Sequence, residues 1–132
     1  VSGWKVVYRS SAGTSDTTLV TIPAGTSVAA GGFYLVGGSD YAGASTADQS
    51  FSTGLAGTGG AVGVRDTAAA LVDSVGWGTA TNALVEGAAA AAPPATAAPG
   101  SSLVRLPDGH DTNANASDFT VSSAATPRAA NH

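Results

Sequence analysis

The sequence predicts an all-β domain, and three observations carry that prediction. Short runs alternate between apolar and polar residues, which is the period of a half-buried strand, and many of them are rich in β-branched residues. Turn formers separate these runs, with 18 glycines in a chain of 132 residues. No stretch shows the period of a convincing amphipathic helix. We therefore expect one β-sandwich domain over residues 1–132, with long Gly- and Ala-rich loops.

The first two strands are expected to form a hairpin. Residues 3–10 alternate, which places Trp4 on one face together with Val6 and Tyr8. Residues 16–22 return after a Ser- and Gly-containing turn and are rich in Thr, Val and Ile. We interpret the Trp4 row as sheet packing, and Trp4 as a structural residue.

The middle of the chain predicts a central strand, a long loop and a second hairpin. The continuous apolar run F-Y-L-V at 33–36 suits a central strand. Residues 37–60 are mostly Gly, Ser, Ala and Thr and predict a surface loop. Two further alternating runs, at 61–66 and 71–77, are expected to pair with each other.

One acidic residue falls inside an apolar row of this second hairpin. With a period of two, Asp73 lies on the same face as Leu71, Val75 and Trp77. A carboxylate on such a face needs hydrogen-bond donors. We expect backbone N–H groups or an arginine to supply them, which makes Asp73 a structural residue.

The last third begins with an Ala- and Pro-rich stretch at 88–100. Its prolines prevent the alanines from propagating a helix, so we expect a solvated loop. Residues 101–106 and 118–122 then predict the final two strands, and a loop dense in Asp and Asn joins them.

Charge and composition exclude some functions and favour a compartment. The net charge is −4 and the five basic residues are scattered, so nucleic-acid binding through phosphate neutralisation is not expected. No apolar run is long enough to span a membrane. The chain lacks cysteine and therefore has no disulfide framework. Scarce Lys with abundant Thr, Ser, Gly and Ala is typical of a secreted or cell-surface bacterial protein.

Taken together, the order of motifs resembles the lamin tail domain, in particular its bacterial branch of secreted and surface proteins. The resemblance covers nearly the whole chain, and it depends on the order and spacing of motifs that are individually weak. These motifs are S-G-W-K-V-V-Y at 2–8, T-I-P-A-G-T at 21–26, G-G-F-Y-L-V at 31–36, V-D-S-V-G-W-G at 72–78, R-L-P-D-G-H-D-T at 105–112, D-F at 118–119 and T-P-R-A-A-N at 126–131.

This resemblance implies an immunoglobulin-like β-sandwich without catalytic residues. The family pattern usually has two strands before the S-G-W turn, and this chain starts at that turn, so those strands are expected to be missing. The closing motif usually has Gly where this chain has Arg128. An exposed sheet edge would follow from the missing strands, and with it edge-strand association between two copies of the chain.

The Asp- and Asn-rich loop carries two alternative interpretations. Oxygen-bearing side chains recur at Asp111, Asn113, Asn115 and Asp118, a spacing that calcium loops use, although the Gly and the final carboxylate of an EF-hand are absent. The other interpretation is a series of Asx-turns. In that case Arg105 would pair with Asp118 or Asp111 as a structural clamp, next to the apolar Phe119.

Catalytic motifs do not assemble in this sequence. There is no G-x-S-x-G elbow, no cysteine nucleophile and no phosphate-binding loop. We therefore expect a non-catalytic extracellular binding, adhesion or accessory module of a larger secreted protein, with no cofactor, whose partner is an extracellular polymer or protein. Two alternatives are a calcium-dependent carbohydrate- or nucleic-acid-binding domain attached to a hydrolase, and a small secreted hydrolase.

Overall fold

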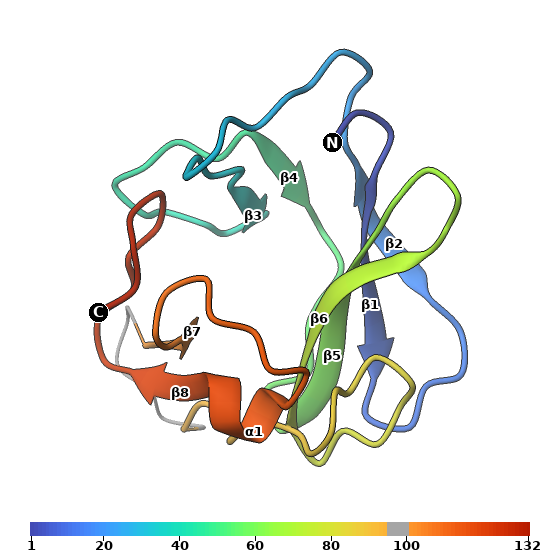
Figure 1. The fold of residues 1–132 in the computed structure, drawn as a ribbon, viewed down its shortest axis with the longest axis vertical. Coiled ribbons are helices and arrows are strands. Elements are labelled where there is room, and N and C mark those ends of the chain that lie inside the picture. Colours follow the sequence, from blue (N-terminus) through green and yellow to red (C-terminus); the bar gives the residue numbers. More distant parts are fainter. Residues whose placement is uncertain (95–100) are drawn as a thin grey trace.

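The computed structural model describes residues 1–94 and 101–132, and it is an all-β protein (Figure 1). Its main sheet has four antiparallel strands in the order β2-β1-β5-β6. Two small sheets pair β3 with β4 in parallel and β7 with β8 in antiparallel. The bounds are β1 Lys5–Ser10, β2 Thr17–Thr21, β3 Val36–Gly38, β4 Gln49–Phe51, β5 Gly59–Arg65, β6 Leu71–Gly78, β7 Ser102–Arg105, α1 Asn115–Asp118 and β8 Phe119–Ser122.

The core lies on both faces of the central strand β1. On one face Val7 is buried together with Ala61 and Leu84. Trp4, which directly precedes β1, is only half-buried. The predicted period of β1 is present, but the residue it buries most deeply is Val7, because the segment after β6 covers that face with Leu84.

The opposite face of the main sheet is fastened to the loop after β4. Tyr8 stacks on Trp77 with 6.4 Å between ring centroids. The Trp77 Nε1–H donates to the Ala56 carbonyl at 2.9 Å, and the Ala56 N–H donates to the Tyr8 hydroxyl at 3.1 Å. Two buried aromatic residues thus satisfy their polar atoms on one loop residue, which holds that loop against the sheet.

A β-bulge in the β5–β6 pair changes which face one residue occupies. Asp73 pairs with Val64, but the next pair joins Leu71 to Arg65, so β6 carries one extra residue. Leu71 therefore turns toward the side of Leu84, where its Cδ1 lies 3.0 Å from the place a Gly63 Cβ would occupy. The prediction that Leu71 shares the face of Asp73 was wrong, because an uninterrupted period of two cannot anticipate a bulge.

The central part of the chain differs most from the prediction. Only Val36 of the run 33–36 belongs to a strand, and Phe33 is 44% exposed, so this run is not a central strand. The predicted loop 37–60 contains the short strand β4. Local hydrophobicity alone misled the prediction here. Within the Ala- and Pro-rich stretch 88–100, residues 95–100 lie outside the described residues.

The two edges of the main sheet are covered to different extents. At the β6 edge, Ala90 forms a bridge: its N–H donates to the Gly76 carbonyl, and its own carbonyl accepts the Gly78 N–H, both at 2.8 Å. Gly76 also lets Val85 pack against this edge, because a Cβ at Gly76 would lie 2.5 Å from a methyl carbon of Val85. At the β2 edge, the Gln49 Nε2–H donates to the Thr21 carbonyl at 3.0 Å.

The C-terminal segment returns to the small β3–β4 sheet. Arg128 adopts φ +61°, in the left-handed region, and forms an ion pair with Asp48. No helix among the described residues is long and apolar enough to cross a membrane, since the helical structure there is the single turn α1.

Candidate functional site

A dense group of polar side chains surrounds α1, which contacts both β8 and β6. Figure 1 shows β7 beside β8, next to α1. We call this group the polar clamp. It joins the C-terminal third of the chain to the edge of the main sheet. Its members are Asp73, Ser74, Glu86, Arg105, Asp111, Asn115 and Asp118.

Asn115 is the centre of the polar clamp, and its side chain has no exposure to solvent. Its Oδ1 accepts the backbone N–H groups of Gly76 at 2.8 Å and Glu86 at 3.0 Å. Its Nδ2 donates to the Ser74 carbonyl and to Glu86 Oε2, both at 3.0 Å. An asparagine amide can accept two hydrogen bonds and donate two, so every position is filled. The side chain therefore bonds to the β6 edge as the backbone of a neighbouring strand would.

Asp118 closes the loop that precedes α1, and it is 2% exposed. Its Oδ1 accepts the Thr112 hydroxyl at 2.6 Å, and its Oδ2 accepts the N–H groups of Thr112 and Ala114. The hydrogen bond from the Thr112 hydroxyl, followed by that from the Thr112 N–H, lowers the pKa of Asp118 below its ordinary value of 3.8. The ionised carboxylate is therefore part of the folded loop.

Arg105 links the loop to β6. Its Nη2 donates to Asp73 Oδ1 at 2.7 Å, and its Nη1 lies 3.7 Å from Asp111 Oδ2. The guanidinium stacks over the Phe119 ring at 4.7 Å from the centroid, which is a cation–π geometry. Burial alone would lower the pKa of Arg105, but the hydrogen bond that it donates to Asp73 and the nearby negative charges raise it. The guanidinium forms its ion pairs with Asp73 and Asp111 and none with Asp118.

Three carboxylates of the polar clamp come together, with oxygens within 4.8 Å of one another: Asp73, Glu86 and Asp111. Within the described parts of the chain, this is the one such acidic group close enough to hold a metal ion. Both Glu86 oxygens already accept hydrogen bonds, from Ser74 and from Asn115. The positive charge in contact with this group is supplied by Arg105.

The residues predicted to bind calcium are arranged differently from a calcium loop. The Asn115 oxygen accepts two backbone N–H groups, and both Asp118 oxygens accept hydrogen bonds from their own loop. Asp111 Oδ1 accepts the Asn113 N–H at 2.9 Å, which is an Asx-turn. Asn113 is exposed at φ +56°. Only Asp111 belongs both to the predicted set and to the acidic group above.

Sequence reasoning missed Glu86 and Ser74 as members of the polar clamp. Glu86 lies in a segment without any strand period, and Ser74 belongs to a run that reads as ordinary strand. Their proximity to Asn115 arises from long-range packing, because the residues lie 29 and 41 positions away from Asn115.

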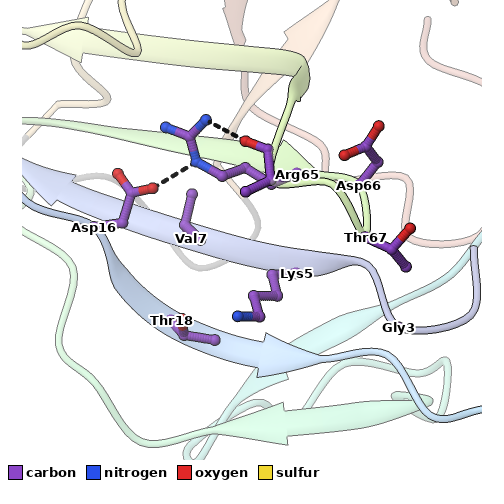
Figure 2. A pocket seen from close by; sticks show the side chains of 9 residues that line it. Gly3, Lys5, Val7, Asp16, Thr18, Arg65, Asp66 and Thr67 are labelled. Carbon is purple, nitrogen blue, oxygen red and sulfur yellow. Dashed lines mark hydrogen bonds and ion pairs between the residues drawn. The ribbon is translucent and has the colours of Figure 1, made fainter.

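A second group of charged residues lines a pocket of about 360 Å³ on the main sheet, where β1, β2 and β5 meet the turn after β5 (Figure 2). We call it the Lys5 pocket. Lys5 is exposed, whereas Val7 beneath it is buried. Arg65 crosses the pocket to donate from Nε to Asp16 Oδ2 at 2.5 Å. Burial raises the pKa of Asp16, but hydrogen bonds from Arg65 and Arg9 outweigh it and lower the pKa overall.

Comparison with protein-family models, with curated proteins and with solved structures yields no match to this chain. The resemblance to the lamin tail domain therefore rests on the order and spacing of sequence motifs alone.

Proposed function

We propose that this chain is a non-catalytic, extracellular binding or accessory module of a larger secreted bacterial protein, with an immunoglobulin-like sandwich of the lamin tail kind. The all-β architecture supports this fold, since two small sheets lie on one side of the four-stranded sheet (Figure 1). The composition, poor in lysine and without cysteine, supports a secreted or cell-surface location.

The observation that carries the proposal is that protein partners already occupy the hydrogen-bonding atoms at the centre of the polar clamp. Catalytic carboxylates and bases need a free atom aimed at a substrate. Here the Asn115 amide is filled by protein partners, and each carboxylate oxygen of Glu86 and Asp118 accepts at least one hydrogen bond. Residues of the kind that perform chemistry in enzymes thus hold the last two strands in place, which suits a rigid binding scaffold.

The experiment is a sedimentation assay with insoluble extracellular polymers, including acidic and neutral polysaccharides, and with bacterial cell walls. The proposal expects the intact domain to sediment with at least one polymer and to release no soluble product from it. Clear hydrolysis by the domain alone would contradict the non-catalytic proposal. Binding to none of the polymers, at protein concentrations in the high micromolar range, would contradict the binding proposal.

The acidic group in the polar clamp favours one alternative, a calcium-dependent binding domain attached to a hydrolase. Its three carboxylates would be the ligands, with Asp111 shared with the sequence prediction. A calcium titration monitored by thermal unfolding separates the two. Our proposal expects the same melting temperature in calcium and in EDTA, because Arg105 already pairs with Asp73 and Asp111, and Ser74 and Asn115 already donate to Glu86. A rise in melting temperature with calcium would favour the alternative.

A further inference from the structure

Lys5 is the one basic residue without an ion pair among the described residues, which include every charged residue of the chain. The four arginines each contact at least one carboxylate, and Lys5, the only lysine, contacts none. In a protein of net charge −4, an ammonium left unpaired beside a pocket is an exception to the local charge balance.

The surroundings of Lys5 increase this imbalance. Lys5 and Arg65 are direct partners across β1 and β5, and like charges in this position destabilise a sheet. Asp16 is shared, since Arg9 binds its Oδ1 at 2.6 Å and Arg65 binds its Oδ2 at 2.5 Å. Arg9 lies outside the pocket lining, so both Asp16 oxygens are occupied by arginines and Lys5 has no carboxylate partner there. A bound anion would supply the partner that Lys5 lacks.

The lining offers more than charge. Figure 2 shows Lys5 and Thr18 at one part of the pocket and Thr67 at another, with Arg65 reaching across toward Asp16. Arg65 uses Nε for Asp16 and Nη1 for the Ala69 carbonyl, and its Nη2 has no partner among the described residues. Lys5 and Arg65 thus supply free donors.

Two further features set the shape and chemistry of a ligand. The side chain of Val7 lines the pocket between the polar groups and provides an apolar surface. Asp66 accepts two backbone N–H groups on Oδ1, and no described residue donates to its Oδ2. The volume of about 360 Å³ lies at the small end of the range for ligand sites.

We propose that the Lys5 pocket binds the carboxylate of an acidic sugar unit, such as a uronic acid of an extracellular polysaccharide. Lys5 and Arg65 Nη2 receive the carboxylate, Thr18 and Thr67 face the sugar hydroxyls, and Val7 contacts the apolar side of the ring. A single carboxylate supplies the one partner that Lys5 lacks, whereas a doubly charged phosphate would bring a second negative charge close to Asp16 and Asp66. This inference rests on the proposed function as a binding module, and it names the class of polymer.

The uniqueness of Lys5 permits a direct test. Reductive methylation with ¹³C-formaldehyde labels two amines, that of Lys5 and the N-terminus of Val1, and keeps their charge. Galacturonate should shift the Lys5 signal in a saturable manner in the millimolar range, with the Val1 signal unmoved. Galactose, which has no carboxylate, should leave both signals unchanged. No shift with galacturonate, or an equal shift with inorganic phosphate, would overturn the proposal.

Variants complete the test with oligogalacturonate as the probe. Lys5→Gln should weaken binding about tenfold or more, since a charged hydrogen bond is lost. Lys5→Arg keeps the charge and should retain most of the affinity. If the Lys5→Gln domain still sediments with an acidic polymer as the wild type does, the pocket assignment fails and the binding function stands. If no polymer sediments the wild type but galacturonate still shifts Lys5, the broader proposal fails and the pocket stands.

Discussion

The polar clamp and the Lys5 pocket use similar side chains in opposite ways. In the clamp, Arg105 meets two carboxylates, and Asn115 has all four hydrogen-bonding positions filled. In the pocket, Asp16 is occupied by Arg65 and, from outside the lining, by Arg9, and Lys5 has no partner among the described residues. The difference teaches that polar side chains occupied by protein partners mark a structural joint, whereas side chains left without such partners mark the surface open to a ligand.

Breaking the clamp at its centre should have the largest effect. Asn115→Ala leaves the N–H groups of Gly76 and Glu86 and the Ser74 carbonyl without their partner, and it leaves a cavity. We expect a loss of about 3–5 kcal/mol in unfolding free energy, since each unsatisfied buried group costs roughly 1–3 kcal/mol. Chemical denaturation measures this loss.

A matched control lies two residues upstream in the same loop. Asn113 is exposed with φ +56°, so Asn113→Gly should change the unfolding free energy by less than about 0.5 kcal/mol. Equal losses for the two variants would mean that Asn115 is not the centre of the joint.

Removing the unpaired charge should affect binding and leave the fold intact. Lys5→Gln relieves the repulsion from Arg65 across the strands, so its stability should equal or slightly exceed the wild type, by about 0.2–1 kcal/mol. Its affinity for oligogalacturonate should fall about tenfold or more. Isothermal titration calorimetry and thermal unfolding on the same samples measure both quantities. A Lys5→Gln domain that unfolds at a clearly lower temperature would show that Lys5 stabilises the fold, which contradicts a role in binding alone.

The pH dependence of stability should report on Asp118. Its pKa is lowered in the folded state, so its contribution is present above its unfolded pKa of about 4 and is lost as pH falls through the lower folded value. The wild type should therefore lose stability below about pH 4. Asp118→Asn should be less stable at pH 7 and should show a shallower decline in acid. Identical acid slopes would show that Asp118 is not linked to folding. Asp16 and Asp48, whose pKa values are also lowered, account for the slope that remains.

The smallest effect is expected at the edges of the main sheet. The β6 edge is covered by Ala90 and Asn115, whereas the β2 edge bonds to the Gln49 side chain. We propose that two copies pair weakly along β2, as an uncharged edge strand allows. Sedimentation equilibrium should show a mass that rises with concentration, and Leu19→Lys should remove this rise. A constant monomer mass for the wild type would exclude the pairing.

Much of the fold could be predicted because several strands follow a local pattern. The runs at β1, β2, β5 and β6 alternate regularly, and turn residues bound them. The β6 bulge, the short β3–β4 pair and the exposure of Phe33 could not be predicted, because tertiary packing decides them. The same limit applied to the sites. Asp73, Arg105, Asp111 and Asp118 were visible by their chemistry, but the partners Ser74 and Glu86 were not.

The Lys5 pocket could not be predicted from the sequence, for a different reason. Lys5 reads as the polar position of an alternating strand, and nothing local reveals that Arg65 lies opposite it. That juxtaposition depends on the register between β1 and β5, which are separated by about fifty residues. Charge pairing can therefore be judged only when the whole sheet is known.

The central claim is the division of roles between the clamp and the pocket, and one paired measurement tests it most directly. Melting temperature and affinity for oligogalacturonate are measured for wild type, Lys5→Gln and Asp118→Asn under the same conditions. The account predicts that Lys5→Gln loses affinity at an unchanged or slightly raised melting temperature, and that Asp118→Asn melts earlier but binds as the wild type does. Weakened binding in Asp118→Asn at a temperature where it is fully folded, with full binding in Lys5→Gln, would contradict the account.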